Sequence, residues 1–445
     1  MEAITPSARR VLERLKRAGH EAYLVGGCVR DLLLGRRPGD WDITTSARPD
    51  EVLSLFAPQA APTGLRHGTV TVFEGAMPFE VTTFRLDGAY ADHRHPDAVV
   101  FSDSLVEDLK RRDFTVNAMT MDQTGEITDL FGGREDLARG VLRCVGCPEQ
   151  RFEEDALRIL RALRFSSVLG FSIAPETADA AFQKKDLLRE VAVERVREEL
   201  LKLLCGRSAV PVLLQYAEVL GVVLPEILPA VGCDQRNIHH CYDVWEHIAR
   251  TVGFAPPSAV LRMTMLLHDL GKPETMTVDE DGTGHFKGHA DVSCTLGKTI
   301  LERLHFDKES AGRILTLVKW HDVPVEPTER AVRRLLHKLG EQGVRDLLQV
   351  KRADNLAQAS AYRGRQKQID TLEVLLQQVL EQDACFSLRQ LSVNGRDLLE
   401  QGYRGREVGA ALQFLLGAVI DGTLPNEKQA LLQALSTKPV PNAPE

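Results

Sequence analysis

A short stretch near the start of the chain groups residue types that suit phosphate and metal binding, namely Gly26, Gly27, Arg30, Asp40 and Asp42. It is predicted to form a strand, a glycine turn, a short helix and a second strand that opens with the two aspartates. Because side chains alternate between the faces of a strand, carboxylates at i and i+2 should point the same way. Neighbouring carboxylates repel each other unless a cation lies between them, and Mg²⁺ shared with substrate phosphates is the usual one.

The glycines and the arginine complement these carboxylates. Gly26 and Gly27 let backbone N–H groups approach a phosphate closely, and Arg30 lies one turn into a helix whose N-terminus favours an anion. Taken separately, the two halves are equally well explained by a tight turn and a solvated acidic loop, because paired glycines and aspartates two residues apart are common. At this separation, the combination favours a site for a nucleoside triphosphate.

A third carboxylate could join this site from a later strand. The segments 69–73 and 79–85 alternate like two strands of one sheet, and the second of them carries Glu80. Two-metal nucleotidyl transfer uses a carboxylate cluster of this kind to hold the attacking hydroxyl and the triphosphate in line. The alternative is an exposed strand glutamate without a ligand.

The segment 107–122 offers further groups for a nucleotide. It is predicted to be helical around Arg112, Asp113 and Asn117, so that Asp113 and Asn117 share a face at i and i+4. A cation for the triphosphate, beside a carboxylate and an amide for ribose hydroxyls, suits nucleotide binding. A surface salt bridge with a helix cap is the alternative.

The predicted helix 151–165 places Asp155, Arg158, Arg161 and Arg164 three residues apart along one face. Such a stripe is ordinarily a solvated face with ion pairs. At the mouth of a nucleotide site it could read a base edge, because arginine offers paired donors and aspartate accepts from an exocyclic amine.

A separate group of histidines occupies the region 239–354. His247 lies in a predicted helix, and His268 and Asp269 close an apolar helix. An adjacent His–Asp pair, offset by about 100° around a helix, is better explained by two ligands of one ion than by core packing, the usual role of a lone histidine. The same region also carries His289, His321 and Asp354.

The elements that must position these residues change along the chain. Residues 1 to about 145 alternate helical and strand patterns, whereas the chain from Arg151 onward is predicted to be helical only. With 445 residues, the chain should form three or four domains. Its 43% hydrophobic and 27% charged residues are typical of a globular protein.

Charge, cysteines and hydropathy exclude several classes of protein. The net charge of −8 argues against non-specific coating of nucleic acid but allows a local basic groove for RNA. The eight cysteines are scattered like reduced thiols, and the one CxxC, at 144–147, has no second pair for a zinc ribbon. There is no apolar run long enough to cross a membrane, and the N-terminus reads as a charged amphipathic helix, so a cytoplasmic protein is expected.

Six motifs, in this order, resemble those of the class II tRNA nucleotidyltransferases, which are the CCA-adding enzymes and relatives of bacterial poly(A) polymerase. They are GGCVRDLLLG…GDWDIT, FEVTTFR, Tyr90–Asp92–Arg94–Pro96, RRDFTVNAM, DLFGGREDL and EEDALRILRALRF. The resemblance covers the chain up to Phe165. It implies that Asp40 and Asp42 bind the catalytic Mg²⁺.

The same resemblance implies roles in nucleotide binding. The incoming triphosphate would be held by Gly27, Arg30 and Arg112. A ribose would be recognised by Asp113 and Asn117. The family's amino-acid template, whose Asp and Arg pair with the edge of CTP or ATP, is matched by Glu154, Asp155 and Arg158. Further nucleotide-contacting arginines are matched by Arg161 and Arg164, and the loop that helps to switch from C to A addition is matched by Asp92 and Arg94.

The histidine region is similar to an HD domain, which is typically a metal-dependent phosphohydrolase. The ligands of such a domain are matched by His247, His268, Asp269 and Asp354. A second metal could be completed by His289 and His321, and imidazole suits a transition metal. The segment 391–435 resembles the C-terminal region that contributes to holding tRNA in CCA-adding enzymes with an HD domain.

Together these resemblances imply an α+β protein in four parts. A polymerase-beta-like nucleotidyltransferase head (1–147) is followed by an all-helical neck (148–230), an HD domain (231–360) and a helical C-terminal region (361–445). The expected reaction is template-independent addition of C, C and A to a tRNA 3′ end from CTP and ATP. Addition of A only or CC only, or poly(A) synthesis, is the alternative. A rival of another class is a metal phosphohydrolase with a nucleotide-binding module, which the intact carboxylates argue against.

Overall fold

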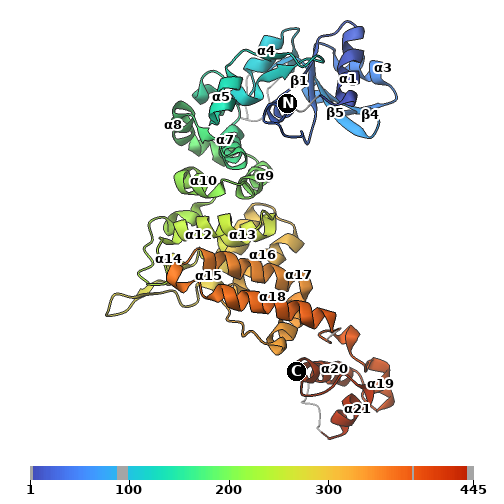
Figure 1. Ribbon diagram of the computed structural model, residues 1–445, viewed down its shortest axis with the longest axis vertical. Helices are drawn as coiled ribbons and strands as arrows, with labels where there is room; N and C mark the ends of the chain where they lie inside the picture. Colours follow the sequence, from blue (N-terminus) through green and yellow to red (C-terminus); the bar gives the residue numbers. More distant parts are fainter. Residues whose placement is uncertain (1–3, 88–98, 383–384, 438–445) are drawn as a thin grey trace. The chain divides into compact units, whose positions relative to one another are not determined.

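The computed structural model describes residues 4–87, 99–382 and 385–437. The chain divides into two compact units, Met1–Leu228 and Pro229–Glu445 (Figure 1). Tyr90, Asp92, Arg94 and Pro96, which carry one motif of the resemblance, lie outside the described residues.

The first unit contains a mixed sheet of seven strands in the order β3-β4-β5-β2-β1-β8-β9. Its strands are β1 (Ala22–Val25), β2 (Asp42–Thr45), β3 (Ala60–Gly64), β4 (Thr69–Glu74), β5 (Met77–Thr83), β8 (Met119–Met121) and β9 (Ile127–Asp129). β2 and β5 are parallel neighbours, whereas β4 and β5 form an antiparallel hairpin. In β5, Phe79, Val81 and Thr83 are buried and Glu80 is exposed, so the predicted alternation is confirmed.

Helices of this unit flank the sheet or follow it in the chain. They are α1 (Pro6–Arg17), α2 (Gly27–Leu33), α3 (Pro49–Phe56), α4 (Leu105–Lys110), α5 (Gly133–Arg139), α6 (Pro148–Glu154), α7 (Leu157–Leu169), α8 (Pro175–Gln183), α9 (Val193–Leu204), α10 (Ala209–Gln215) and α11 (Ala217–Leu220). Two short pairs complete the unit, β6 (Arg85–Asp87) with β7 (Val99–Phe101) and β10 (Val141–Leu142) with β11 (Ser172–Ile173).

Three expectations for this unit were wrong in detail. The second strand begins at Asp42, and Asp40 lies in the exposed bend before it, so strand alternation does not orient the two carboxylates together. The helix expected in 107–122 ends at Lys110, because the chain beyond it pairs in extended form with the segment 143–145 through Thr115 N to Arg143 O and Val145 N to Asp113 O.

The helix expected over 151–165 is divided in two. α6 ends at Glu154 and α7 begins at Leu157, with Asp155 in an extended conformation between them. The Asp155 carboxylate accepts a hydrogen bond from Leu157 N (3.1 Å), and this side-chain contact with the backbone competes with a continuous helix. The predicted template residues therefore lie at and beside a break between two helices.

The second unit is a helical bundle followed by a smaller helical group (Figure 1). The bundle comprises α12 (Val244–Phe254), α13 (Ala259–Leu267), α14 (Lys272–Thr275), α15 (His289–Arg303), α16 (Lys308–Trp320), α17 (Glu329–Leu356) and α18 (Arg365–Glu381). Between α14 and α15 lies a short hairpin of β12 (Thr277–Val278) and β13 (Gly284–His285). These strands and β11 contradict the expectation that the chain from Arg151 onward is helical only. The α+β fold class is confirmed.

Side-chain caps fix where several of these helices begin. Asp243 caps α12 by accepting from Glu246 N, Asp307 caps α16, and Thr328 caps α17. α17 contains one break, because Gly340 has φ 68° and ψ 172° instead of helical values. The smaller group, α19 (Gly395–Glu400), α20 (Arg406–Ile420) and α21 (Lys428–Thr437), has its own cluster of buried apolar residues that includes Leu398, Leu415 and Leu431.

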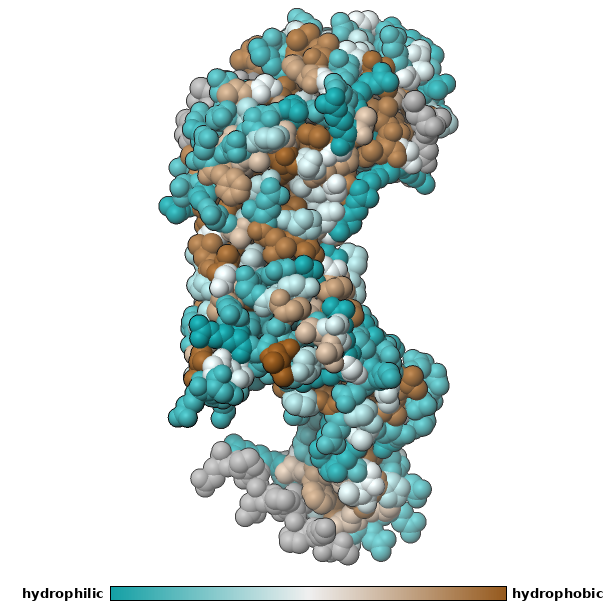
Figure 2. All heavy atoms as spheres, turned by 60° about the vertical axis from the view of Figure 1, so that its left-hand side comes forward, coloured by the Kyte–Doolittle hydropathy of each residue, from teal (hydrophilic) through white to brown (hydrophobic). Residues whose placement is uncertain are grey.

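The surface in the view of Figure 2 is mostly hydrophilic, and its hydrophobic residues form small separate groups. Within residues 4–87, 99–382 and 385–437, no helix combines the length and apolar character needed to cross a membrane.

Candidate functional site

Three carboxylates of the first unit lie close together around the start of β2. The register of the parallel strands pairs Asp42 of β2 with Glu80 of β5, and Asp40 lies two residues before Asp42. Burial, opposed by the charge of Arg112 and reinforced by those of Glu80 and Asp40, raises the pKa of Asp42 to about 6. A cation bound among these oxygens would relieve the repulsion.

Gly26 lies next to both the Asp42 carboxylate and Arg112. Its φ is 77°, and a Cβ added there would lie 3.3 Å from Arg112 Nη1 and 3.8 Å from Asp42 Oδ2. The position requires glycine for its backbone conformation and because a side chain would crowd both charged groups. The predicted role of a glycine turn beside the charged groups is therefore consistent with the geometry.

Arg112 is held by a buried aspartate that the sequence analysis did not single out. Asp108, whose side chain is fully buried, accepts from Arg112 Nη2 (3.2 Å), Arg111 Nη2 (2.6 Å) and Thr44 Oγ1 (3.0 Å). Burial alone would raise the pKa of Asp108, but the two arginines lower it. Asp108 lies on α4 four residues before Arg112, and this i, i+4 spacing could have indicated the pairing in the sequence. Arg112 Nε is buried and has no hydrogen-bond partner in the part of the chain that the structure describes.

A continuous series of polar contacts links α2 to α7. Arg30 Nη1 donates to Asn117 Oδ1 (2.7 Å), and Asn117 Nδ2 donates to Asp113 Oδ1 (3.3 Å). The other oxygen of Asp113 accepts from Arg161 Nε (2.9 Å) and Nη2 (2.6 Å). Burial would raise the pKa of Asp113, but Arg161, with Arg158 and Asn117, lowers it to about 2. Four of the predicted nucleotide-binding residues thus lie in one network, although the helix expected to align two of them is absent.

Two of the predicted template residues, Glu154 and Arg158, pair with each other, whereas the third has a partner on another helix. Glu154 accepts from Arg158 Nη1 (2.6 Å) and also from Arg151, while Arg158 Nη2 donates to the carbonyl of Arg111 (3.0 Å). Asp155 instead accepts from Arg195 of α9 through Nη2 (2.8 Å) and Nη1 (3.2 Å). Sequence reasoning missed Arg195, because no local pattern marks a residue that pairs across two helices.

Arg164 completes the row along α7. Its Nε lies 2.7 Å from Glu199 Oε2, and its guanidinium carbon lies 3.9 Å from the centre of the Phe165 ring. Arg161 and Arg164 therefore leave α7 toward different acidic partners, Asp113 and Glu199. The structure brings Arg161, but not Arg164, into the network with Arg30.

The second unit gathers six side chains of types that can bind a metal, from separate elements. They form two sets of three, and within each set the ligand atoms lie within 4.8 Å of one another. The first set is His247, His268 and Asp354, and the second is Asp269, His289 and His321. His247 comes from α12, His268 and Asp269 follow α13, and Asp354 lies near the end of α17. All six residues that the sequence singled out for this site are therefore in one cluster.

Asp269, a member of the second set, also approaches the histidines of the first. Its Oδ2 is 3.3 Å from the Nε2 atoms of His247 and His268, and its Oδ1 is 3.3 Å from His289 Nε2 and 3.6 Å from His321 Nε2. These approaches lack hydrogen-bond geometry at His268 Nε2 and at both Asp269 oxygens. His247 Nε2, by contrast, lies within hydrogen-bond distance of Asp354 Oδ1 (3.0 Å). Three buried ligand atoms that converge without a hydrogen bond fit a site for cations.

The histidine tautomers also suit metal binding. The Nδ1 atoms of His268, His289 and His321 lie 2.7, 2.8 and 2.6 Å from the carbonyl oxygens three residues before them. Because a carbonyl oxygen only accepts, Nδ1 carries the proton, and Nε2 presents a lone pair to the cluster. His289 Nε2 and His321 Nε2 lie 3.1 Å apart, and a shared cation would relieve the repulsion of their lone pairs.

One cation of the chain already contacts this cluster. Lys272 Nζ lies 2.7 Å from Asp269 Oδ2 and donates to Gln235 Oε1 at 2.9 Å. Although burial acts to raise the pKa of Asp269, the neighbouring His268 and Lys272 hold it well below its usual range. The carboxylate is therefore ionised and available as a ligand at neutral pH.

Family models match three parts of the chain. The model of the poly A polymerase head domain matches residues 22–143, and that of the RNA and SrmB-binding site of polymerase A matches residues 170–230. The model of tRNA nucleotidyltransferase domain 2 matches residues 292–435.

Individual relatives extend this similarity over nearly the whole chain. The chain is 54% identical over 199 residues to a CCA-adding enzyme of Lactobacillus delbrueckii subsp. bulgaricus, a match that spans 45% of this chain and about half, 50%, of that protein. It is 37% identical over 430 residues to a CCA-adding enzyme of Levilactobacillus brevis, covering 96% of this chain and 97% of that protein. The crystal structure of the Bacillus stearothermophilus CCA-adding enzyme in complex with CTP covers 98% of this chain and 99% of its own, with 33% identity and a TM-score of 0.75.

Proposed function

The chain belongs to the family of CCA-adding enzymes, and from this membership we propose that it adds C, C and A to the 3′ end of tRNA without a nucleic-acid template, using CTP and ATP. The observation that carries the proposal is the position of Asp42 opposite Glu80, beside Arg112, at a glycine turn. A carboxylate pair next to a held arginine suits a cation and a triphosphate together. We propose that the protein is cytoplasmic, because tRNA ends are available there as substrates.

Asp40, Asp42 and Glu80 offer only oxygen ligands, which suits Mg²⁺. Once bound, Mg²⁺ would neutralise charge on the triphosphate and favour ionisation of the attacking hydroxyl. In the proposed reaction the terminal ribose hydroxyl of tRNA attacks the α-phosphate of the nucleotide, and pyrophosphate leaves. Arg112 and Arg30 hold the triphosphate, and the turn at Gly26 and Gly27 leaves room for it.

Nucleotide choice is proposed to lie at the joint between α6 and α7. Asp155 and Arg158 would exchange Arg195 and Glu154, their present partners, for the edge of the incoming base. Asp113 and Asn117 would meet the ribose from the network that also holds Arg30. Base contacts specify while phosphate contacts position, so the two tasks belong to different residues.

The direct test incubates the full chain with Mg²⁺ and three tRNA transcripts, which lack CCA, lack only the final A, or are complete. With CTP and ATP supplied separately and together, the first should gain C, C and A, the second only A, and the third nothing. Extension by C alone or by A alone would identify a CC-adding or an A-adding enzyme, and long A tails would identify a poly(A) polymerase.

We propose in addition that the His–Asp cluster of the second unit is a separate HD-type metal site that hydrolyses phosphate esters. The contacts of Asp269 with histidines of both ligand sets support this second activity. Four imidazoles favour transition metals over Mg²⁺, and such an ion lowers the pKa of bound water toward neutrality. The test measures hydrolysis of p-nitrophenyl phosphate and of cyclic nucleotides with Mn²⁺, Co²⁺ or Ni²⁺. No hydrolysis with any of these metals would refute it.

A further inference from the structure

Asp108 of α4 is a fully buried carboxylate that serves two arginines unequally. Its Oδ1 accepts two hydrogen bonds from Arg111, through Nε (3.0 Å) and Nη2 (2.6 Å), whereas its Oδ2 accepts one longer bond from Arg112 Nη2 (3.2 Å). The double contact matches the charge of Asp108 with that of Arg111. Two positive charges thus face one negative charge, so Arg112 keeps a positive charge that another anion can use.

Thr44 fixes the direction of the oxygen that faces Arg112. Its side chain is buried, and its hydroxyl donates to Asp108 Oδ2 at 3.0 Å. Thr44 and Asp42 lie two residues apart on β2, so their side chains leave the same face of the strand. The strand that carries a proposed metal ligand therefore also sets the position of Arg112, through Asp108.

Arg112 is close to a second carboxylate with which it does not pair. Arg112 Nη1 and Asp42 Oδ2 both lie within 4 Å of the place that a Cβ on Gly26 would take. Within the described residues, the one ion pair and the one side-chain hydrogen bond of Arg112 go to Asp108. A guanidinium that is not held and lies this close to a carboxylate would pair with it, because the two groups form strong charge-assisted hydrogen bonds. Such a pair would cover oxygens that Mg²⁺ needs.

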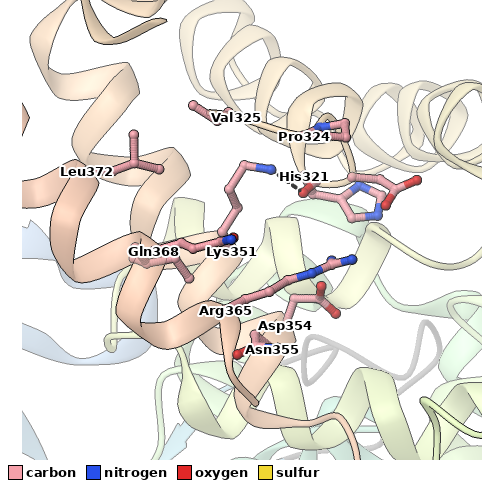
Figure 3. Close-up of a pocket in the computed structure, with 11 residues that line it drawn as sticks. His321, Pro324, Val325, Lys351, Asp354, Asn355, Arg365, Gln368 and Leu372 are labelled. Carbon is pink, nitrogen blue, oxygen red and sulfur yellow. Dashed lines mark hydrogen bonds between the residues drawn. The ribbon is translucent and has the colours of Figure 1, made fainter. Parts of the chain in front are cut away.

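An arginine beside a carboxylate is not always held in this chain. In the second unit, Arg365 is exposed, and its side chain has no ion pair or hydrogen bond among the residues that the structure describes. Figure 3 shows its guanidinium extending past Asp354 toward His321. Arg112 differs because a buried acid fixes one end of its guanidinium. Burial of a charged acid is costly, so the held orientation of Arg112 calls for an explanation.

We infer that Asp108 is a positioning residue for nucleotide transfer, which holds Arg112 away from Asp42 so that the guanidinium stays available for the triphosphate and the carboxylate for the cation. The inference rests on the proposed transfer reaction and adds a residue to it. Because Asp108 is fully buried, it reaches neither the nucleotide nor the cation and acts through Arg112. Loss of its charge should therefore weaken binding of CTP and raise the concentration of Mg²⁺ that binding requires.

Titration of CTP into the full chain with Mg²⁺ and without tRNA, followed by calorimetry, measures the first effect apart from turnover. Asp108→Asn keeps the size of the side chain but removes its charge, and it should weaken CTP binding about tenfold, the loss expected for one charge-assisted hydrogen bond. The double variant Asp108→Asn/Arg112→Gln should bind CTP as well as Arg112→Gln does, because Asp108 acts through Arg112. A purely structural role would add a separate loss in the double variant.

The same titration at several concentrations of Mg²⁺ measures the second effect. In Asp108→Asn, the released Arg112 competes with the cation for Asp42. The Mg²⁺ concentration that gives half-maximal CTP binding should therefore rise about fivefold, as expected for competition from one ion pair. The double variant lacks the competing guanidinium, so its Mg²⁺ requirement should match that of Arg112→Gln.

Glu107 is the matched control, because it is the neighbouring acid on α4 and its side chain has no ion pair or hydrogen bond within the described residues. Glu107→Gln should bind CTP like the parent. Thr44→Val tests the same arrangement with both arginines and the charge of Asp108 in place, and it decides the question if Asp108→Asn does not fold. Loss of the hydroxyl should weaken CTP binding about threefold, and this loss should vanish in the Arg112→Gln background.

The inference is overturned if Asp108→Asn binds CTP like the parent, if its Mg²⁺ requirement is unchanged, or if the losses in the double variant add. These outcomes differ from failure of the proposed reaction. Addition of C by the parent, with CTP binding unchanged in Asp108→Asn, would keep the reaction and refute the inference. CTP binding that depends on Asp108 only while Arg112 is present, without addition to any tRNA, would keep the positioning role and refute the reaction. A parent chain that does not bind CTP would refute both.

Discussion

Asp42 lies directly opposite Glu80 across the parallel strands β2 and β5. Parallel strands need a crossover connection, and α3, β3 and β4 provide it between these two residues. The two carboxylates are therefore brought together by the topology of the sheet, and their mutual repulsion contributes to the raised pKa of Asp42.

Replacement of Asp42 by Asn should lower kcat/KM for both C and A addition about a thousandfold, because the proposed cation serves every addition. Binding of tRNA, measured by filter retention, should change little. Asp50→Asn, at an exposed position of α3, is the matched control and should be fully active. Loss of C addition with A addition intact would place the catalytic metal elsewhere.

The raised pKa of Asp42 predicts a pH-dependent stability in the absence of metal. Its pKa is about 6 in the folded chain against an ordinary value of 3.8, so ionisation of the folded chain costs stability as pH rises between these values. In EDTA, Asp42→Asn should therefore raise Tm relative to the parent at pH 8 and lose this advantage below pH 4. Equal Tm differences at both values would contradict the assignment.

Arg195 should affect nucleotide selection although it lies on α9. The Arg195→Ala variant removes the two guanidinium contacts that orient Asp155 before a nucleotide binds, so incorporation of U and G relative to C and A should rise about tenfold, as it should in Asp155→Ala. Arg189→Ala, which removes an exposed arginine paired to Asp186, serves as control. Selectivity is measured with all four nucleotides. If it stays at the parental level in both test variants, the break between α6 and α7 does not select the nucleotide.

The pairing of Asp113 with Arg161 should stabilise the first unit. Asp113→Asn leaves a guanidinium without its carboxylate, and the free energy of unfolding should fall by about 3 kcal/mol at pH 7. Because the folded pKa of Asp113 is lowered to about 2, this contribution is present above pH 4 and is lost as pH falls toward 2. The control is Asp103→Asn, whose exposed pair with Arg48 should contribute less than about 1 kcal/mol. Denaturant titration measures both.

The two proposed metal sites should be separable. Replacing His268 and Asp269 by Ala should abolish binding of transition metal, measured by elemental analysis of the purified chain, and any hydrolysis of phosphate esters. Addition of C and A should continue at the parental rate, because the carboxylates of the head lie on other elements. Equal loss of both activities in a variant that remains folded would falsify the separation.

Some of this architecture is readable from local pattern. Apolar and polar residues alternate from Phe79 to Thr83, which indicates a strand with one buried face. The position of Glu80 on the other face of β5 therefore follows from the sequence. His268 and Asp269 are marked by adjacency after an apolar helix. Their partner Asp354 lies far along the chain, and only the resemblance to a known family connected it to them.

Other features depend on contacts that no local pattern contains. The apolar residues around Asp155 continue smoothly from α6 into α7, so a continuous helix was the natural prediction. The actual break requires the Asp155 carboxylate to bond Leu157 N and Arg195 at the same time. In the same way, extended pairing of Phe114 with Cys144 overrides the helical pattern beyond Lys110.

The break in α17 has a consequence that concerns handedness. At Gly340, nothing lies within 4 Å of the place where a Cβ would project, yet the φ of 68° is one that L-residues rarely adopt. An L-alanine at this site therefore meets no neighbouring atom, and its cost comes from the backbone conformation alone. A D-alanine introduced there by chemical ligation should lower the free energy of unfolding less than L-alanine does, because a positive φ is the ordinary range for a D-residue.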